Sequence, residues 1–188
     1  MFQKFIELWQ ALPKEGGNVP AKACFSPTLA PRLVPNLFVA EHKARFDLEV
    51  RLLGTEIESR PSFRVSGENL FSRLHEDDWE FFEAFLAAYR KHPCAARVKR
   101  RVTSGGRVYD LHTLGAPLMD ADGNASFIMG VGYAETNMAE SEKAQKKREA
   151  GRRASPKTAT APVICEAVFI DLGYGVPTLK LDRFNRPH

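Results

Sequence analysis

Residues 50–60, VRLLGTEIESR, begin as a strand and end as a short polar segment. The apolar residues at the start of this stretch favour a strand. Gly54 then interrupts the strand, and Pro61 closes a segment that is too short to form a stable helix alone. We therefore expect the strand to leave a sheet at Gly54. The short segment would then begin a crossover that packs on the face of that sheet.

Two strands are predicted up to this point. Residues 45–53, RFDLEVRLL, alternate between apolar and charged side chains, which is typical of an antiparallel strand with one buried face. Residues 37–40 predict an earlier strand, and Lys43-Ala44 suits a turn between the two. The predicted buried face of the second strand comprises Phe46, Leu48, Val50 and Leu52, and its charged face comprises Asp47, Glu49 and Arg51.

Residues 76–93, beyond the crossover, predict the clearest helix of the chain. Acidic residues in its first turn and basic residues in its last turn are both favourable to the helix dipole. Pro93 ends it, because proline cannot continue a helix. Its apolar stripe comprises Trp79, Phe82, Leu86 and Tyr89, widened by Phe81 and Phe85.

Three strands joined by short turns follow the helix, over residues 95–102, 108–119 and 125–134. This order predicts an α+β fold, in which helices cross one face of a five-stranded antiparallel sheet. The connection between the second and third strands must cross that face, because it contains all the central helices. It therefore encloses a space between sheet and helices, where a small molecule would bind.

Residues 1–17 predict an amphipathic N-terminal helix, with Phe5, Ile6, Trp9 and Leu12 on one stripe. A free helix this short is marginally stable, so the stripe must pack on another apolar surface. That surface is either the sheet of the same chain or a second copy of it. We predict a homodimer that uses these four residues.

Several stretches of the chain resemble a PAS domain, and more narrowly the short PAS-like domains of alphaproteobacteria, long described as a domain of unknown function. The resemblance covers roughly residues 5–135. It rests on Trp9, on the aromatic helix before His92-Pro93, and on the stretches FSPTLAPRLVPNLFV (25–39), RFDLEVRLLGTEIE (45–58) and VSGENLFSRL (65–74). The chain departs from the family at residues 59–67, SRPSFRVSG, where the family usually has a glycine after an aromatic residue. We therefore expect displaced helical turns there.

The resemblance implies a non-catalytic sensory or protein-interaction module of bacterial signal transduction, with signalling proteins as partners and space for a small ligand. No nucleotide-binding, hydrolase or metalloprotease motif is found, so we predict that the chain is not an enzyme. The same apolar residues could line a pocket or simply fill the core. The pocket candidates are Phe71, Leu74, Phe82, Leu86, Tyr109, Leu111, Met129 and Val131.

The sequence does not identify a cofactor. Flavin-binding relatives need a reactive cysteine on the early helical segment, and residues 54–75 contain none, which excludes that light-sensing chemistry. Some relatives bind haem through a histidine, for which His75 is the candidate here, although a polar residue near a helix start is the simpler interpretation. The three cysteines are scattered, which argues against disulfides and a zinc site.

The net charge of +4 equals the excess of basic over acidic residues between residues 140 and 160. We interpret residues 138–161 as a basic linker, between the domain at residues 18–137 and a tail with strand character at residues 162–188. Residues 143–157 offer an alternative function, which is binding to a nucleotide, a nucleic acid or an anionic membrane. We expect a cytoplasmic protein, because no apolar stretch reaches about 18 residues.

Overall fold

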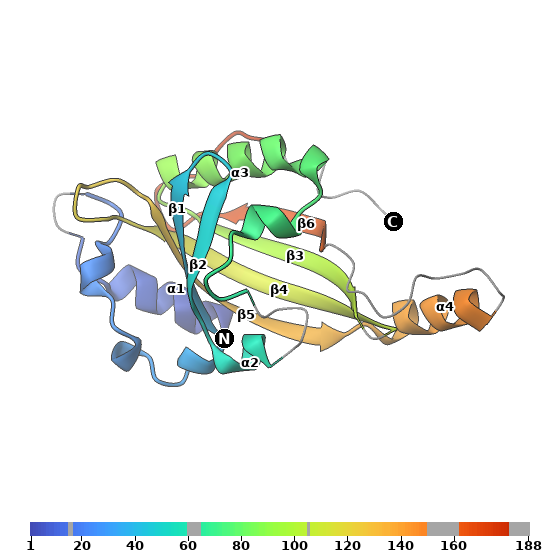
Figure 1. The fold of residues 1–188 in the computed structure, drawn as a ribbon. Helices are drawn as coiled ribbons and strands as arrows, with labels where there is room; N and C mark the ends of the chain where they lie inside the picture. Colours follow the sequence, from blue (N-terminus) through green and yellow to red (C-terminus); the bar gives the residue numbers. More distant parts are fainter. Residues whose placement is uncertain (15–16, 60–64, 105, 150–161, 181–188) are drawn as a thin grey trace.

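The computed structural model describes residues 1–14, 17–59, 65–104, 106–149 and 162–180. It is an α+β fold, as predicted, with one antiparallel sheet and helices on both faces (Figure 1). In chain order the elements are α1 (Phe2–Ala11), η1 (Lys22–Cys24), η2 (Pro27–Leu29), η3 (Val34–Asn36), β1 (Leu37–Ala44), β2 (Asp47–Leu53), α2 (Thr55–Glu58), η5 (Leu70–Arg73), η6 (Glu76–Asp78), α3 (Trp79–Lys91), β3 (Ala95–Ser104), β4 (Arg107–Leu118), β5 (Phe127–Thr136), α4 (Met138–Glu149) and β6 (Val163–Ile170).

The sheet has six strands in the order β2-β1-β5-β4-β3-β6, so the prediction of five was wrong by one. The additional strand, β6, comes from the segment that we interpreted as a tail. It pairs antiparallel with β3, from Ala95 opposite Ile170 to Arg101 opposite Val163. Its pairing covers the edge of β3 that would otherwise present unpaired backbone groups.

Gly54 is the point at which the chain leaves the sheet, as the sequence predicted. Its amide donates a hydrogen bond of 2.7 Å to the carbonyl oxygen of Leu37, and α2 begins at Thr55. A Cβ atom at this position would lie only 2.3 Å from the carbonyl oxygen of Pro35. The chain therefore needs a glycine here because two backbone segments touch. Residues 60–64, where we expected displaced helical turns, lie outside the described part of the chain.

The hairpin between β1 and β2 differs from the prediction at two places. Its turn lies at Arg45-Phe46 and not at Lys43-Ala44, and Phe46 adopts the left-handed conformation with φ of 61°. The register also shifts within the hairpin, because Val39 pairs with Leu52 but Ala40 pairs with Val50. One extra residue in β2 turns Leu52 to the face opposite Leu48 and Val50, as a β-bulge does.

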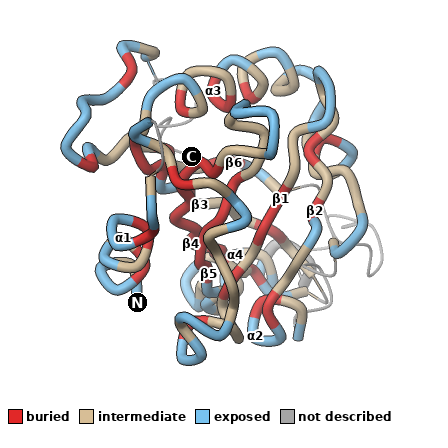
Figure 2. Tube along the Cα trace, turned by 90° about the vertical axis from the view of Figure 1, so that its left-hand side faces the viewer, coloured by how far each residue is buried: buried red, intermediate tan, exposed pale blue. Residues whose placement is uncertain are grey.

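Helix α1 covers one face of the sheet, and α3 with the short central helices covers the other (Figures 1 and 2). Phe5 and Trp9 are fully buried against strands β4 and β5 of the same chain, Leu12 is buried, and Ile6 is half-buried. The indole Nε1 of Trp9 donates a hydrogen bond of 2.8 Å to the carbonyl oxygen of Pro117. The stripe on α1 was expected to pack either on the sheet of its own chain or on a second copy, and in this structure it packs on the sheet of its own chain. A homodimer that uses this stripe stays a prediction, although Phe5, Trp9 and Leu12 are already buried within one chain.

Candidate ligand-binding cavity

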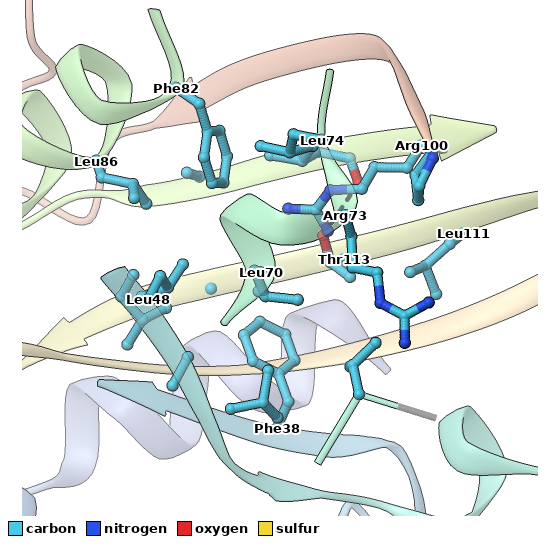
Figure 3. A pocket seen from close by; sticks show the side chains of 18 of the residues that line it. Phe38, Leu48, Leu70, Arg73, Leu74, Phe82, Leu86, Arg100, Leu111 and Thr113 are labelled. Atoms are coloured by element: carbon cyan, nitrogen blue, oxygen red, sulfur yellow. Dashed lines mark hydrogen bonds between the residues drawn. The ribbon is translucent and has the colours of Figure 1, made fainter. Parts of the chain in front are cut away.

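A cavity of about 340 Å³ lies between the sheet and the central helices (Figure 3). Ligand pockets in proteins typically measure roughly 300–1,000 Å³, so this cavity is at the small end of that range. It lies where the sequence predicted an enclosed space, under the connection that crosses the sheet. The sheet forms its floor, and η5 and α3 form much of its roof.

The floor of the cavity is formed by alternate residues of β3 and β4. Successive side chains of a strand point to opposite faces, so every second residue of β3 faces the cavity. These are Ala96, Val98, Arg100 and Val102, and Leu111, Thr113 and Gly115 face it from β4. The floor is therefore apolar except for the Arg100 guanidinium and the Thr113 hydroxyl group.

Two glycines make room for an aromatic ring in the floor. Phe38 of β1 lines the cavity, and its ring lies over Gly130 of β5 and Gly115 of β4. A Cβ atom at Gly130 would lie 2.4 Å from Cζ of Phe38, and one at Gly115 would lie 3.4 Å from the same atom. Larger residues at these positions would push the Phe38 ring into the cavity.

The roof is an aromatic layer on α3. Phe82, Phe85, Leu86 and Tyr89 lie at helical spacing and line the cavity, and Figure 3 shows Phe82 and Leu86 reaching from the helix towards the strands. The ring of Phe82 packs edge-on against Phe71, with centroids 5.3 Å apart. Such contacts hold the roof rigidly.

Arg100 is the unusual residue of this site. The other three cavity-facing residues of β3 are apolar, and its guanidinium lies 5.8 Å from the centre of the Phe82 ring. Burial lowers the pKa of Arg100 from its ordinary value to about 10, so the group stays charged at neutral pH. Within the described part of the chain, no carboxylate pairs with it. Sequence reasoning missed it, although strand alternation with Val98 and Val102 places it on the inward face.

Among the described residues that line the cavity, Arg73 of η5 is the other charged one. Its guanidinium is partly exposed and forms a salt bridge of 2.5 Å with Glu68. In Figure 3, Arg73, Arg100 and Thr113 lie towards one end of the cavity, whereas Leu48 and Leu86 lie towards the other. The cavity thus has a polar end and an apolar end.

Half of the predicted pocket residues line the cavity: Leu74, Phe82, Leu86 and Leu111. Phe71 and Tyr109 lie on the same side of the sheet but pack beside the cavity, in the aromatic cluster and against Ile57 respectively. The assignment of Met129 and Val131 was wrong, because both are fully buried on the opposite face, under α1. Strand alternation is the reason, since Ile128 and Gly130 occupy the cavity side of β5.

The family model described as PAS domain matches residues 2–132 of this chain. This range contains β1, β2, β3, β4 and the part of β5 up to Gly132, and it does not contain β6. This match covers more than half of the sequence. The chain belongs to the PAS domain family. The predicted resemblance is therefore confirmed.

Two solved structures are similar to this PAS domain in fold. One is an RNA-binding light-oxygen-voltage receptor, which is 17% identical over 74% of this chain and 41% of its own, with a TM-score of 0.45. The other is a light-oxygen-voltage domain studied with a flavin analogue, which is 16% identical over 66% of this chain and 96% of its own, with a TM-score of 0.42. This chain therefore spans less than half of the RNA-binding receptor. No curated protein matches the sequence.

The candidate cofactor residues lie away from the cavity of this PAS domain. His75 is exposed, and its Nδ1 accepts a hydrogen bond from the amide of Asp77 at the start of η6. Neither His75 nor any of the three cysteines is among the residues that line the cavity, which therefore does not fit the haem or cysteinyl-flavin chemistry of relatives. Across the described ranges, no three His, Cys, Asp or Glu side chains gather as a metal site, and no helix is long and apolar enough to cross a membrane.

A buried aspartate connects the sheet of the PAS domain to α4. Asp110 of β4 is nearly fully buried and accepts hydrogen bonds from Arg101 at 2.8 Å and from the side-chain amide of Asn137 at 2.9 Å, and Lys99 pairs with it. Burial alone would raise the pKa of Asp110, but these three partners outweigh it and hold the pKa well below its ordinary value. Asn137 also accepts a hydrogen bond from the amide of Glu140, at the start of α4.

Replacing Asp110 with asparagine should lower stability by about 1–3 kcal/mol at neutral pH, because hydrogen bonds to a charged acceptor are lost. The folded-state pKa is depressed, so the carboxylate stabilises the fold above the unfolded pKa of about 3.9 and this contribution is lost as pH falls further. In urea unfolding, the stability difference between wild type and Asp110→Asn should be constant near pH 7 and should narrow from about pH 5 to pH 3, where the unfolded carboxylate becomes protonated and the folded one does not. A difference that stays constant down to about pH 3 would contradict this account, and Asp122→Asn on the exposed β4–β5 turn is the control.

Proposed function

We propose that this chain is a non-catalytic sensory or protein-interaction module of signal transduction, which binds a small ligand in the cavity between sheet and helices. The observation that supports this most directly is the cavity itself. An apolar core normally packs without voids of this size, so an apolar space of about 340 Å³ under an aromatic roof favours an occupant.

The link between β3 and α4 offers a path by which an occupant would affect a partner. Arg100 faces the cavity, and its neighbour Arg101 faces the other side of the sheet and bonds to Asp110. Asp110 bonds to Asn137, next to the first residue of α4. A ligand that shifts β3 would therefore change contacts at the start of α4, a helix that extends away from the domain (Figure 1).

The proposal predicts that a side chain that fills the cavity weakens ligand binding. Ala96→Phe places a ring on the cavity face of β3, and Ala139→Phe adds the same ring at an exposed position of α4. Ligand-observed NMR with a mixture of small apolar and amphipathic compounds should detect binding to wild type and to Ala139→Phe. Binding to Ala96→Phe should be at least tenfold weaker.

Two outcomes would contradict this function. One is that no compound of the mixture binds wild type. The other is that Ala96→Phe, folded by circular dichroism, retains the same binding as Ala139→Phe, because the compounds would then bind outside the cavity.

Binding of a nucleotide, a nucleic acid or an anionic membrane through residues 143–157 stays a prediction. Residues 150–157 lie outside the described part of the chain. Within the described part, Lys143 forms a salt bridge of 2.8 Å with Glu140 on α4. A mobility shift with RNA that weakens as salt increases would support this alternative, and its absence at low salt would contradict it.

A further inference from the structure

We propose that the ligand of this cavity is a small carboxylic acid with an apolar body, whose carboxylate pairs with Arg100. This inference rests on the proposed function, since it names the chemical class of the ligand for the same cavity. Three features of the cavity support it: the position of Arg100, the chemistry of its surroundings, and the apolar character of the remaining walls.

Strand alternation places the side chain of Arg100 on the inward face of β3, towards the cavity. Its neighbours on the same face of β3 are Val98 and Val102, whereas Arg97, Lys99 and Arg101 lie on the opposite face. Each of those three outward cations has a carboxylate partner: Glu166 for Arg97, and Asp110 for Lys99 and Arg101. Among the described residues, Arg100 has no such partner, although it is the cation of β3 that faces the cavity.

The cavity presents donors without a matching negative charge. Among the described residues that line it, none is an aspartate or a glutamate. Tyr89 also lines the cavity, and burial raises the pKa of its hydroxyl group well above the ordinary value, so this group stays protonated and able to donate. Arg100 and Tyr89 are close enough that each affects the pKa of the other.

A desolvated guanidinium gains most from an anion with two oxygens. Removing a cation from water is costly unless it is paired, and arginine binds carboxylates with two parallel hydrogen bonds. The guanidinium carbon of Arg100 lies 5.8 Å from the centre of the Phe82 ring, and that ring carries no oxygen that could accept its hydrogen bonds. A bound carboxylate would supply the counter-charge that the described residues do not.

The rest of the cavity selects an apolar body. Leu48 and Leu86 lie on the side of the cavity away from Arg100 (Figure 3), Phe38 and Ile128 also line it, and none of these side chains can hydrogen-bond. The volume of about 340 Å³ admits a short chain or a single ring rather than a long lipid. A carboxylate at one end and a short apolar body at the other match the polar and apolar ends of the cavity.

Isothermal titration calorimetry with octanoate, 1-octanol and octylamine tests this inference on the full chain. These probes share one apolar body and differ in the head group. We expect octanoate to bind wild type at least tenfold more tightly than octanol, and octylamine more weakly than either. Arg100→Met should reduce octanoate affinity at least tenfold and leave octanol affinity unchanged. Arg97→Met, on the outward face of the same strand, is the control and should bind octanoate like wild type.

Each contrary outcome identifies what is wrong. Equal binding of octanoate and octanol to wild type would overturn the carboxylate class and leave a ligand cavity in place. Loss of octanoate binding in Arg73→Met but not in Arg100→Met would overturn the assignment to Arg100. No binding of any of the three probes would overturn the inference, while the compound mixture and Ala96→Phe test the cavity's function independently. If Arg100→Met fails to fold, the head-group comparison on wild type still decides, and Arg100→Lys should retain a preference for octanoate.

Discussion

Replacing Gly54 with alanine is expected to destabilise the protein by about 2–3 kcal/mol, the upper part of the range for inserting atoms into a packed site. The new Cβ would lie 2.3 Å from the carbonyl oxygen of Pro35 and 2.4 Å from that of Val34. Both are backbone atoms, so no side-chain rotation can relieve the clash. The chain would have to move η3 away from the start of α2.

Urea unfolding followed by circular dichroism measures this effect, and Gly17→Ala is the matched control. A Cβ at Gly17 would meet only Cε of Met119, at 3.8 Å, which is an ordinary contact. The control should therefore change stability by less than about 0.5 kcal/mol. If Gly54→Ala were equally mild, the close approach of η3 and α2 would not be needed for the fold.

Replacing Trp9 with alanine should cost about 3–5 kcal/mol, which is the usual cost of removing a buried aromatic side chain. The side chain is fully buried between α1 and the sheet, and its indole donates to the carbonyl oxygen of Pro117. Alanine leaves a large cavity under α1 and an unpaired carbonyl. Because the packing of α1 depends on this stripe, we expect the helix to detach first.

Two measurements check the role of Trp9. Trp9→Phe retains most of the apolar area and loses the hydrogen bond, so it should cost less than Trp9→Ala in thermal or urea unfolding. Light scattering should show the same oligomeric state for Trp9→Phe and wild type, since the stripe packs within one chain. A homodimer stays a prediction, and dissociation of a wild-type dimer by Trp9→Phe would contradict a purely intramolecular role of this residue.

The alternation of residues 45–53 predicted a half-buried strand correctly but assigned Leu52 to the wrong face. A regular strand would place Leu52 beside Val50, and the extra residue in the pairing with β1 turns it towards α1. Local sequence does not show such a shift, because it is a property of two strands in contact. The assignment of Met129 and Val131 to the pocket failed for a related reason, since two apolar faces of one sheet look alike in sequence.

The inward position of Arg100, by contrast, can be read from the alternation of residues in its strand. The alternation of Ala96, Val98 and Val102 places residue 100 on the inward face, so the sequence alone could have identified an inward-facing cation. What it could not show is the absence of a partner among the described residues. That depends on η5, α3 and β6, which are brought around the site only by folding.

The order of elements, the exit of the chain from the sheet at Gly54 and the crossover that encloses a space could all be predicted from local sequence. These follow from periodicity and from glycine and proline, which act over a few neighbouring residues. Folding was needed to show that α1 packs on its own sheet, that β6 joins the sheet beside β3, and that Arg100 has no carboxylate partner among the described residues. Those outcomes depend on which apolar surfaces meet, and such contacts join residues far apart in the chain.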